Sequence, residues 1–598
     1  MSKVKLLLLN LPIPDFIKNF QRGNSQIYSF YIESIILNLN IDNIETVRLP
    51  RKIVETYNNN AIVKEIVNLK PDIVGFSSYL WNIDRNINIS LKLKEFGIVT
   101  VTGGPEISIQ NEYLIKNRYF DYYIENEGEY LLIDLINKII NKKHINNFIS
   151  NNSNIDFNDF IFKYTQISDD YKTDRLFYLE IERGCPFKCN YCAYNKFRNK
   201  ITSIDFEIFK NCITEVYKKN IEEIYLLAPT LNRDKKRFVR ILEDIINLRK
   251  KTGKKIKLFG EIRAELINND EDIKLMKNAG FTDIEFGLQT FNIKSYKKLN
   301  RTQINFNPIE FSKKLLDNGI TPLIDFMIGL PHDSYSGIIE AIDLIDRNGL
   351  LEYSNFYHLH ILANTELRSI FNKCHYVYGR KSPYLSYKVD TLDFSDIAKI
   401  YYYIENKKNY SFNMDFFDYN EDNFFVIKRD SDFSLLKNYP YYNFASFLMV
   451  DNFSDSSIVD FFRSFLNDNK EIFFKLFLYS KKEIDLNFLN ALNDFFINNR
   501  NYYDLYREGL NYSGDRVFSK NMHILLSINI DKKVFDKYND KFLVDFILSP
   551  EDLNSKSFDI GLADRYYNEY GVYTYLFKDD NTGIEGEYIR RLPFNFII

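Results

Sequence analysis

Residues 182–192 read Glu182-Arg183-Gly184-Cys185-Pro186-Phe187-Lys188-Cys189-Asn190-Tyr191-Cys192, and the whole chain of 598 residues has only five cysteines. A disulfide framework spreads an even number of cysteines along a short secreted chain, so this crowding predicts a metal site. Thiolates in the spacing Cys-x3-Cys-x2-Cys can bind three irons of a cubane cluster and leave the fourth iron open. Structural zinc is the alternative, but it needs a fourth Cys or His ligand, and the nearest upstream histidine is His144.

The sequence around and after this motif predicts alternating strands and helices. Apolar runs predict strands at residues 177–182, 223–227, 256–262, 283–288, 322–328 and 355–362. Amphipathic segments between them predict helices at residues 206–218, 235–250, 270–278, 308–317 and 336–347. Six such βα units predict a partial TIM-type barrel, (β/α)6, with its active site at the carboxyl ends of the strands. The cysteine motif follows the first of these strands and therefore lies at that end.

A second βα series precedes the motif. Strands are expected at residues 4–9, 46–49, 73–77, 99–102 and 120–124, and helices at 27–38, 61–69, 87–95 and 128–140. This alternation predicts a doubly wound, Rossmann-like parallel sheet, which binds ligands at the carboxyl ends of its strands.

Length and composition set the domain organisation. At roughly 100–200 residues per domain the chain holds about four segments. We expect an N-terminal domain at 1–148, a linker at 149–173, the barrel at 174–390, and a mainly helical domain at 391–598 that binds substrate or acts as a lid.

The charge balance, with Lys+Arg 78 against Asp+Glu 81, gives no basic footprint for nucleic acid. No apolar run approaches the roughly 18–20 residues of a membrane span. The leucines after Lys5 end at Asn10 and Pro12, too early for a secretory signal. We therefore expect a cytoplasmic protein without a membrane span and without nucleic acid as its partner.

The cysteine motif resembles that of the radical S-adenosylmethionine (SAM) superfamily. The resemblance implies that Cys185, Cys189 and Cys192 bind a [4Fe-4S] cluster whose open iron is chelated by SAM. An electron from the cluster then cleaves SAM to a 5′-deoxyadenosyl radical, which implies a low-potential electron donor of flavodoxin or ferredoxin type. Tyr191, the aromatic residue before the third cysteine, corresponds to a position near the adenine in this family.

Further segments resemble the family at the ends of successive predicted strands. They are Ala228-Pro229-Thr230-Leu231-Asn232, Glu261-Ile262-Arg263, Glu285-Phe286-Gly287-Leu288-Gln289, Arg301, residues 325–331 and Ala363-Asn364-Thr365-Glu366-Leu367-Arg368. The resemblance implies that SAM is bound by Tyr191, Pro229, Thr230, Glu261, Arg263, Glu285, Gln289 and Arg301. Ala228 stands where the related subgroup commonly has an acid, and for Glu261 or Glu285 alone a capping role is the alternative.

The N-terminal segment resembles the cobalamin-binding domain that precedes the barrel in cobalamin-dependent radical SAM enzymes. The similarity lies in residues 71–82 and in Thr102-Gly103-Gly104-Pro105-Glu106. It implies that Ser78 and Leu80 receive the nucleotide tail of cobalamin, while Gly103 and Gly104 let the backbone approach the corrinoid.

Two features of this segment leave alternatives open. Residues 125–129 resemble an acidic Gly-Glu segment of the family, but they could equally be a solvated helix start. No histidine precedes His144, which excludes an axial ligand from an Asp-x-His-x-x-Gly motif. A domain that keeps the fold without binding a corrinoid is therefore the alternative.

Other candidate residues have structural interpretations beside the functional ones. His358 and His360 alternate on the predicted sixth strand and are expected on one side, as substrate contacts or as hydrogen-bonded structural residues. We expect Cys374 to be a buried inert thiol rather than a donor of a hydrogen atom to a substrate radical. Cys212 is expected to belong to the core. Trp81 is expected to pack inside its domain, beside a corrinoid if one is bound.

The resemblance implies a cobalamin-dependent radical SAM enzyme. Such an enzyme would methylate an unactivated carbon of a small-molecule or peptide substrate through methylcobalamin and a 5′-deoxyadenosyl radical. One alternative is a radical SAM enzyme without methyl transfer, an epimerase, ring-forming or rearrangement enzyme whose N-terminal domain is a scaffold. Another is a non-catalytic cobalamin-binding module.

Overall fold

The structure is a computed structural model of the whole chain. It describes residues 3–12, 32–33, 35–36, 41–150, 176–194, 201–267, 269–301, 306–408, 424–427, 444–450, 456–468, 472–480, 483–498, 510–513, 516–519, 522–527, 532–539, 542–548 and 574–576. By their contacts these residues form two compact units. The second holds residues 51–65 and the described residues from Tyr401 onward, and the first holds the others.

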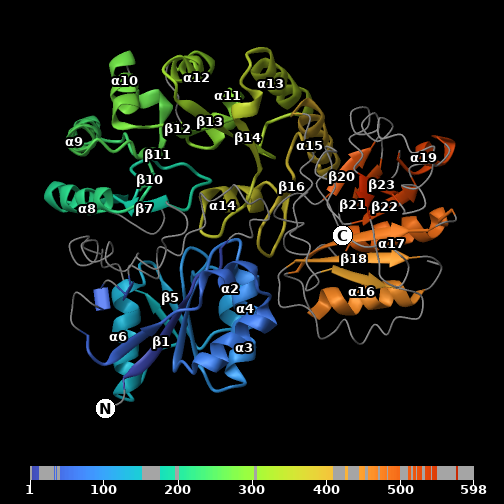
Figure 1. Cartoon of the computed structure of the whole chain (residues 1–598), viewed down its shortest axis with the longest axis horizontal. Helices are drawn as coiled ribbons and strands as arrows, with labels where there is room; N and C mark the ends of the chain where they lie inside the picture. Colours follow the sequence, from blue (N-terminus) through green and yellow to red (C-terminus); the bar gives the residue numbers. More distant parts are fainter. Residues whose placement is uncertain are drawn as a thin grey trace. The chain divides into compact units, whose positions relative to one another are not determined.

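The N-terminal part of the first unit is built on a parallel sheet in the order β2-β1-β3-β4-β5-β6 (Figure 1). Its strands are β1 (Val4–Leu9), β2 (Ile44–Val47), β3 (Ile73–Ser77), β4 (Val99–Gly103), β5 (Tyr122–Glu125) and β6 (Phe148–Ser150). The helices of this part are α4 (Ile83–Lys94), α5 (Glu112–Lys116) and α6 (Glu129–Ile140). Between β2 and β3 in the sequence lie α2 (Arg51–Thr56) and α3 (Asn59–Leu69), of which residues 51–65 belong to the second unit. The strand order reverses between β1 and β3, which gives the doubly wound sheet a switch point there.

The predicted Rossmann-like sheet is confirmed. Of the helix expected at 27–38, only residues 32–33 and 35–36 are described, and all four are helical. The predicted linker at 149–173 begins inside β6, and its residues 151–173 lie outside the described residues.

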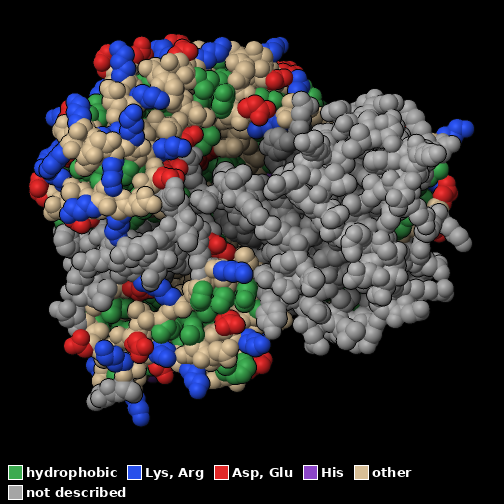
Figure 2. All heavy atoms as spheres, in the orientation of Figure 1, with side chains coloured by type: hydrophobic (Ala, Val, Ile, Leu, Met, Phe, Trp, Pro, Cys, Tyr) green, Lys and Arg blue, Asp and Glu red, His purple; other side chains and the backbone are tan. Residues whose placement is uncertain are grey.

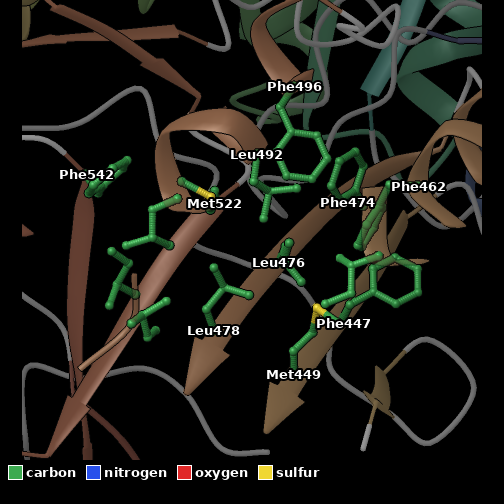
Figure 3. Packing of buried hydrophobic residues seen from close by; sticks show 14 of the residues in the cluster. Phe447, Met449, Phe462, Phe474, Leu476, Leu478, Leu492, Phe496, Met522 and Phe542 are labelled. Carbon is green, nitrogen blue, oxygen red and sulfur yellow. The ribbon is translucent and has the colours of Figure 1, made fainter. Parts of the chain in front are cut away.

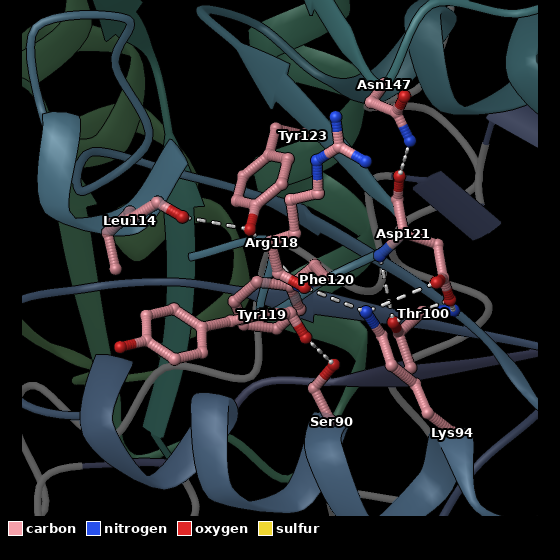
Figure 4. A network of polar contacts seen from close by, with 10 residues as sticks. All are labelled: Ser90, Lys94, Thr100, Leu114, Arg118, Tyr119, Phe120, Asp121, Tyr123 and Asn147. Carbon is pink, nitrogen blue, oxygen red and sulfur yellow. Dashed lines mark hydrogen bonds and ion pairs between the residues drawn. The ribbon is translucent and has the colours of Figure 1, made fainter. Parts of the chain in front are cut away.

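A network of polar contacts fixes β5 beside β4 (Figure 4). The Asp121 carboxylate accepts hydrogen bonds from the backbone nitrogen of Thr100 at 2.8 Å and from its hydroxyl at 2.9 Å. The Ser90 hydroxyl on α4 donates to the Tyr119 carbonyl at 2.9 Å, and Tyr123 donates to the Leu114 carbonyl at 3.0 Å. The loop before β5 is thereby tied to the neighbouring strand and helix.

The second part of the first unit is a parallel sheet in the order β14-β13-β12-β11-β10-β7. Its strands are β7 (Leu176–Glu180), β10 (Glu223–Leu227), β11 (Lys257–Ile262), β12 (Asp283–Gln289), β13 (Thr321–Ile328) and β14 (Ser354–His358). The helices are α8 (Phe206–Lys218), α9 (Lys235–Thr252), α10 (Asp270–Ala279), α11 (Ile293–Lys298), α12 (Pro308–Asp317), α13 (Tyr335–Arg347) and α14 (Glu366–Lys373). Two short antiparallel pairs accompany it, β8 (Glu182–Arg183) with β9 (Thr202–Ser203), and β15 (Val377–Tyr378) with β16 (Ser386–Lys388). The predicted six-unit partial barrel is confirmed.

Capping residues explain where the barrel helices begin. Side chains that accept a hydrogen bond from the first helical turn are Asp205, Asp234, Asn269, Asn307, Ser334 and Thr365. Such N-caps satisfy backbone donors that have no partner within the helix.

The C-terminal region corrects one expectation, because its helices accompany a six-stranded parallel sheet in the order β17-β18-β19-β22-β23-β24. The strands are β17 (Phe424–Ile427), β18 (Phe444–Val450), β19 (Phe473–Tyr479), β22 (Met522–Ser527), β23 (Leu543–Leu548) and β24 (Thr574–Leu576). A hairpin of β20 (Leu510–Ser513) and β21 (Arg516–Ser519), and the helices α15 (Phe394–Lys408), α16 (Ser456–Asp468), α17 (Leu486–Asn498) and α19 (Lys532–Asn539), complete it.

The expectation of a mainly helical domain at 391–598 was therefore wrong, because this region also holds a parallel sheet. Runs such as FASFLMV and FFKLFLY are almost entirely apolar, each with a single polar residue, and periodicity cannot tell a short buried strand from a buried helix segment. Their length of seven residues is the feature that favours strands.

An aromatic cluster forms the core of the second unit (Figure 3). The Phe462 side chain of α16 is completely buried. Its ring centroid lies 5.5 Å from that of Phe447, 5.5 Å from that of Phe474 and 5.4 Å from that of Phe496. These contacts pack α16 and α17 against β18 and β19.

None of the helices in the described part of the chain combines the length and apolarity needed to cross a membrane. On the face shown in Figure 2, Lys and Arg side chains are interspersed with Asp and Glu side chains over the described surface. This mixing agrees with the near-neutral charge of the sequence.

We predict that Phe462→Ala destabilises the C-terminal sheet by about 3–5 kcal/mol, because it leaves a cavity among three other rings. Hydrogen exchange of peptides from β18 and β19 measures this loss as faster exchange. Phe462→Leu, the matched control, should cost about half as much or less. Equal exchange in the alanine variant and the natural protein would show that Phe462 does not hold this core. The fluorescence of Trp81, the only tryptophan and a residue of the other unit, reports whether the first unit is affected.

Candidate functional site

The cysteine loop follows β8 and is fixed by hydrogen bonds on two sides. Gly184 enters it with a φ of 87°, a conformation that favours glycine. The backbone nitrogen of Asn190 donates to the Leu299 carbonyl at 2.9 Å, and its side chain donates to the Lys298 carbonyl at 2.8 Å. From the other side, the backbone nitrogen of Leu367 in α14 donates to the Asn190 carbonyl at 2.9 Å. The loop is therefore held between the segment after β12 and the start of α14.

The three thiols lie close to one another in this loop. Cys189 is buried and Cys185 and Cys192 are partly exposed. Burial raises the pKa of Cys192 to about 12, and the neighbouring thiols of Cys189 and Cys185 add to the rise. Bound iron would reverse this balance, because a cation stabilises thiolates.

The three thiols are spaced Cys-x3-Cys-x2-Cys along the chain, which suits a cubane cluster. Within the described residues, no group of three or more His, Cys, Asp or Glu side chains is gathered closely enough to hold one metal ion. A structural zinc ion needs four ligands around one point. In a cubane cluster each thiolate binds a different iron, so the thiolates stand farther apart.

Tyr191 and Arg301 come together with the end of β12. Arg301 donates through Nη1 to the Tyr191 hydroxyl at 2.8 Å and through Nη2 to the Gly287 carbonyl. Gln289, at a φ of 70°, lies over Gly287, where an added Cβ would meet its Nε2 at 1.9 Å. The Oε1 atom of Gln289 and the Nε atom of Arg301 are buried without a hydrogen-bond partner. Two orphaned polar atoms beside the cysteine loop suit a bound polar molecule.

The other predicted residues on β10 and β11 also lie around the loop. The Cys185 sulfur is 3.9 Å from the Thr230 hydroxyl, which itself donates to the Pro229 carbonyl at 2.7 Å. The Arg263 guanidinium lies 3.9 Å from the centroid of the Phe187 ring and donates through Nε to Glu265 at 2.6 Å. Arg263 thus packs against the cysteine loop through the Phe187 ring.

Three carboxyl groups meet inside the barrel. Glu261 on β11 is the register partner of Glu285 on β12, and Asp325 on β13 shares a hydrogen bond with Glu285. A carboxylate only accepts hydrogen bonds, so one member of the Glu285–Asp325 pair carries a proton. Burial, with Glu285 nearby, raises the pKa of Glu261 to about 7, and burial raises that of Asp325 to about 6. The Tyr225 hydroxyl donates to Glu261 and Asn355 donates to Asp325.

Ser78 and the two glycines have internal partners. Ser78 is fully buried, and its hydroxyl lies 2.7 Å from that of Thr102 and accepts from Asn86 at 3.1 Å. Gly104 has a φ of 108°, and a Cβ there would stand 2.6 Å from the Ser78 carbonyl oxygen. Gly103 would place a Cβ 3.6 Å from the Ile124 carbonyl oxygen. The close approach that Gly104 permits is thus to the protein's own backbone, whereas a Cβ at Gly103 would make only an ordinary contact.

Hydrogen bonds join the N-terminal sheet to the barrel within the first unit. Ser382, between β15 and β16, donates to the carbonyl oxygen of Leu80 in the loop after β3. The Ser108 hydroxyl, after β4, donates to Asn364 at 2.9 Å. The carboxyl ends of the N-terminal strands therefore face the residues that follow β14.

A buried ion-pair network joins the same two parts beside the cysteines. Arg183 donates to Glu127 at 3.1 Å, to Glu129 at 2.7 Å and to Glu180 at 2.7 Å. The acidic segment at 125–129 is therefore not merely a solvated helix start. Sequence reasoning did not assign Arg183 a role, although it precedes Cys185 by only two positions.

The remaining candidate residues, for which the sequence also allowed structural roles, have different outcomes. The His358 Nε2–H donates to the Ser386 carbonyl and the His360 Nδ1–H to the Pro383 carbonyl at 2.7 Å, so both have structural partners. His360 lies beyond β14, which ends at His358. Cys212 is buried as expected, whereas Cys374 is exposed, so its expected burial was wrong. It follows α14 as its C-cap residue, where the chain has left the core. The Trp81 ring stacks on Tyr79 at 4.5 Å between centroids.

Comparison with known proteins identifies the kind of domain that carries these residues. Residues 179–345 match the radical SAM superfamily. The chain contains a radical SAM domain. The match begins in β7, includes the cysteine loop and reaches α13, and this domain implies a [4Fe-4S] cluster and SAM.

Curated proteins are similar to this chain at low identity. The heme chaperone HemW of Buchnera aphidicola is 28% identical over 192 residues, 30% of this chain and 50% of that protein. The anaerobic magnesium-protoporphyrin IX monomethyl ester cyclase of Rubrivivax gelatinosus is 21% identical over 315 residues, 46% of this chain and 54% of that protein. This chain thus spans about half the length of the curated relatives that it matches.

Among solved structures, the cobalamin-dependent SAM radical enzyme OxsB aligns at a TM-score of 0.51 and 15% identity. The alignment covers 67% of this chain and 66% of OxsB. This likeness shows a shared fold.

Besides Arg183, sequence reasoning missed the contacts of Asp325 in the radical SAM domain. Asp325 was noted only as the first residue of the motif at 325–331, yet it completes the carboxyl cluster with Glu261 and Glu285. The signal that could have found it is alternation. Successive side chains of a strand point to opposite faces. Asp325 lies one position before the buried Phe326 and three before the buried Ile328 on β13, so it points to the other face, toward the lumen.

We predict a pH-dependent stability difference for Glu261→Gln. The native pKa of about 7 lies above the ordinary value of 4.5, so the protonated form is favoured by folding and its stabilisation is lost as pH rises from 4.5 to 7. Glutamine does not ionise, and one pKa unit corresponds to about 1.4 kcal/mol. The variant should gain about 1–3 kcal/mol over the natural protein across that interval and no more above pH 7.

Thermal unfolding of the metal-free protein, measured anaerobically from pH 4.5 to 8.5, tests this difference. The matched control is Glu271→Gln, an exposed glutamate on α10. Parallel pH profiles for Glu261→Gln and the natural protein would contradict the raised pKa.

Proposed function

We propose that this protein is a cobalamin-dependent radical SAM enzyme that methylates an unactivated carbon of its substrate. The observation that carries the proposal is the contact between the carboxyl ends of the N-terminal strands and the barrel. The buried Arg183 network and the bond from Ser382 to the Leu80 carbonyl both lie at that contact. Ligands of doubly wound sheets bind at the carboxyl ends of the strands, so a corrinoid bound there would face the barrel.

The comparisons support this assignment at the level of the fold. OxsB, which shares the fold of the two joined parts, is described as cobalamin-dependent and has been solved with aqua-cobalamin and SAM bound. The loops at Ser78–Leu80 and at Gly103 and Gly104 occupy the strand ends where the sequence resemblance implies the corrinoid.

Each group of residues has a distinct task in the proposed reaction. When bound, the cluster and SAM supply radical chemistry, and cobalamin supplies the methyl carrier. Cys185, Cys189 and Cys192 hold the cluster, while Arg301 and Gln289 offer buried polar atoms to SAM. Pro229, Thr230, Arg263 and Tyr191 shape the loop around them.

The lumen carboxyls have a separate task. The pKa of Glu261 is raised to about 7, so its carboxyl can hold a proton near neutral pH and donate a hydrogen bond. Glu285 and Asp325 beside it accept hydrogen bonds from a bound molecule or share a proton with each other.

The remaining segments complete the proposal. A small molecule or peptide is the substrate, and a flavodoxin or ferredoxin type protein is the electron donor. The segments 1–148, 174–390 and 391–598 act as cobalamin, radical SAM and substrate-binding or lid domains.

A second candidate is a radical SAM enzyme without methyl transfer, in which the N-terminal domain is a scaffold. Two observations favour it. The Ser78 hydroxyl already has Thr102 and Asn86 as partners, and Gly104 is required by the Ser78 backbone. These residues hold the domain together whether or not a corrinoid binds.

We predict that Cys189→Ser abolishes cluster assembly. Loss of one thiolate leaves only two protein ligands, so iron and sulfide content after anaerobic reconstitution should fall at least fivefold. Cys374→Ser, in an exposed cysteine outside the loop, is the control and should retain the full cluster. A cluster retained in Cys189→Ser, or lost in Cys374→Ser, would contradict the assignment of the triad.

The proposed function itself is tested by reconstitution with iron and sulfide, with and without hydroxocobalamin, followed by gel filtration and a UV–visible spectrum. We expect about one corrinoid to co-elute per chain beside the cluster absorbance. Incubation with reductant and methyl-labelled SAM should then yield both S-adenosylhomocysteine and 5′-deoxyadenosine. Production of 5′-deoxyadenosine alone, without retained corrinoid, would establish the second candidate. Absence of SAM cleavage would leave only a non-catalytic module.

A further inference from the structure

Glu106 is a buried carboxyl that the proposed chemistry does not use. It follows Pro105 at the end of the glycine loop after β4, and only 3% of its surface is exposed. Its backbone nitrogen donates to the Ser78 carbonyl at 3.2 Å, and the Ser78 nitrogen donates to the Gly103 carbonyl at 2.7 Å. Glu106 therefore belongs to the set of backbone hydrogen bonds that joins the loops after β3 and β4.

The partner of this carboxyl lies on the barrel side. The Tyr384 hydroxyl donates to Oε2 of Glu106 at 2.8 Å, across 278 residues of sequence, and Tyr384 is itself 4% exposed. Asn111 donates to the same hydroxyl at 3.4 Å. The Arg368 guanidinium lies 4.4 Å from the centroid of the Tyr384 ring. Burial raises the pKa of Glu106 to about 7, while Tyr384 and Arg368 oppose the rise.

The same segment of the barrel reaches the cysteine loop. Tyr384 accepts a backbone hydrogen bond from Ile361 at 2.8 Å, and the Arg368 guanidinium donates to the Ile361 carbonyl at 3.0 and 2.6 Å. Leu367, next to Arg368, donates to Asn190 between the second and third cysteines. One short stretch of chain thus contacts both the glycine loop of the N-terminal sheet and the cluster-binding loop.

We propose that Glu106 and Tyr384 are positioning residues that fix the loop at residues 103–111 against the barrel, so that the proposed corrinoid site keeps a set place relative to the cysteine loop. The inference rests on the proposed function for its purpose, but not for its geometry. Neither side chain touches the cluster loop, and each acts through the backbone that it holds. A buried hydrogen bond to a carboxyl group is among the stronger ones in proteins, and loss of one partner leaves the other without compensation.

The variants separate this role from general stability. Tyr384→Phe removes the hydroxyl and keeps the ring beneath Arg368, and Glu106→Ala removes the acceptor. Glu106→Gln keeps an oxygen that can accept from Tyr384 and should restore natural behaviour. The matched control is Tyr378→Phe. Tyr378 is a buried tyrosine whose ring also faces Arg368, and its hydroxyl bonds to Asn372 within the barrel.

The first measurement is hydrogen exchange of the cluster-loaded full chain without corrinoid. In Tyr384→Phe and Glu106→Ala we expect peptides over residues 103–111 to exchange at least fivefold faster, with iron and sulfide content as in the natural protein. Glu106→Gln and Tyr378→Phe should match the natural protein. Unchanged exchange in Tyr384→Phe, or an equal increase in Tyr378→Phe, overturns the inference.

The second measurement is titration with hydroxocobalamin, followed by the corrinoid spectrum. Tyr384→Phe should weaken binding about tenfold, which corresponds to about 1.4 kcal/mol. Equal affinity in Tyr384→Phe and the natural protein overturns the link to the corrinoid. If the natural protein binds no corrinoid, the proposed function fails, and the exchange experiment alone decides whether Glu106 and Tyr384 position the loop.

Discussion

The backbone of Asn190 is the constraint on which the rest of the site depends. The three cysteines lie within eight residues of an irregular loop after β8, and this loop takes its shape from its neighbours. Leu299 binds it on one side and Leu367 on the other, and each bond uses the main chain. These two partners follow the fourth and sixth strands of the barrel, so the shape of the cysteine loop depends on residues that lie far along the chain.

Much of the fold could be predicted from the sequence, because local patterns suffice for parallel βα units. The runs at 223–227 and 73–77 are continuous, apolar and flanked by amphipathic segments, and both are strands as expected. The C-terminal sheet was missed because Phe-rich runs such as that of β19 carry the same apolar signal in a strand and in a helix. The strand-end residues could be predicted only as a set, since Gln289, Arg301 and Tyr191 are brought together by topology.

What could not be predicted is the pairing of polar groups across long separations. Nothing in the sequence near Glu106 indicates Tyr384, which lies 278 residues away, and nothing near Glu127 indicates Arg183. Such pairs depend on how two sheets meet rather than on a local period. The lumen carboxyls are intermediate, because Glu261 and Glu285 were identified from their motifs while Asp325 needed the register of β13.

Burying a charged group costs free energy, and the fold offsets this cost differently at Arg183, Glu261 and Glu106. Arg183 is surrounded by three carboxylates, so its charge is compensated within one network. Among the described residues, no hydrogen bond or ion pair joins Glu261 to a cation, and burial raises the pKa of its carboxyl instead. Glu106 lies between these cases, with a tyrosine hydroxyl and a nearby guanidinium that lower the cost of ionisation without removing it. The charge of Arg183 is thus compensated by ion pairs, whereas burial favours the protonated form of Glu106 at the same joint and of Glu261 inside the barrel.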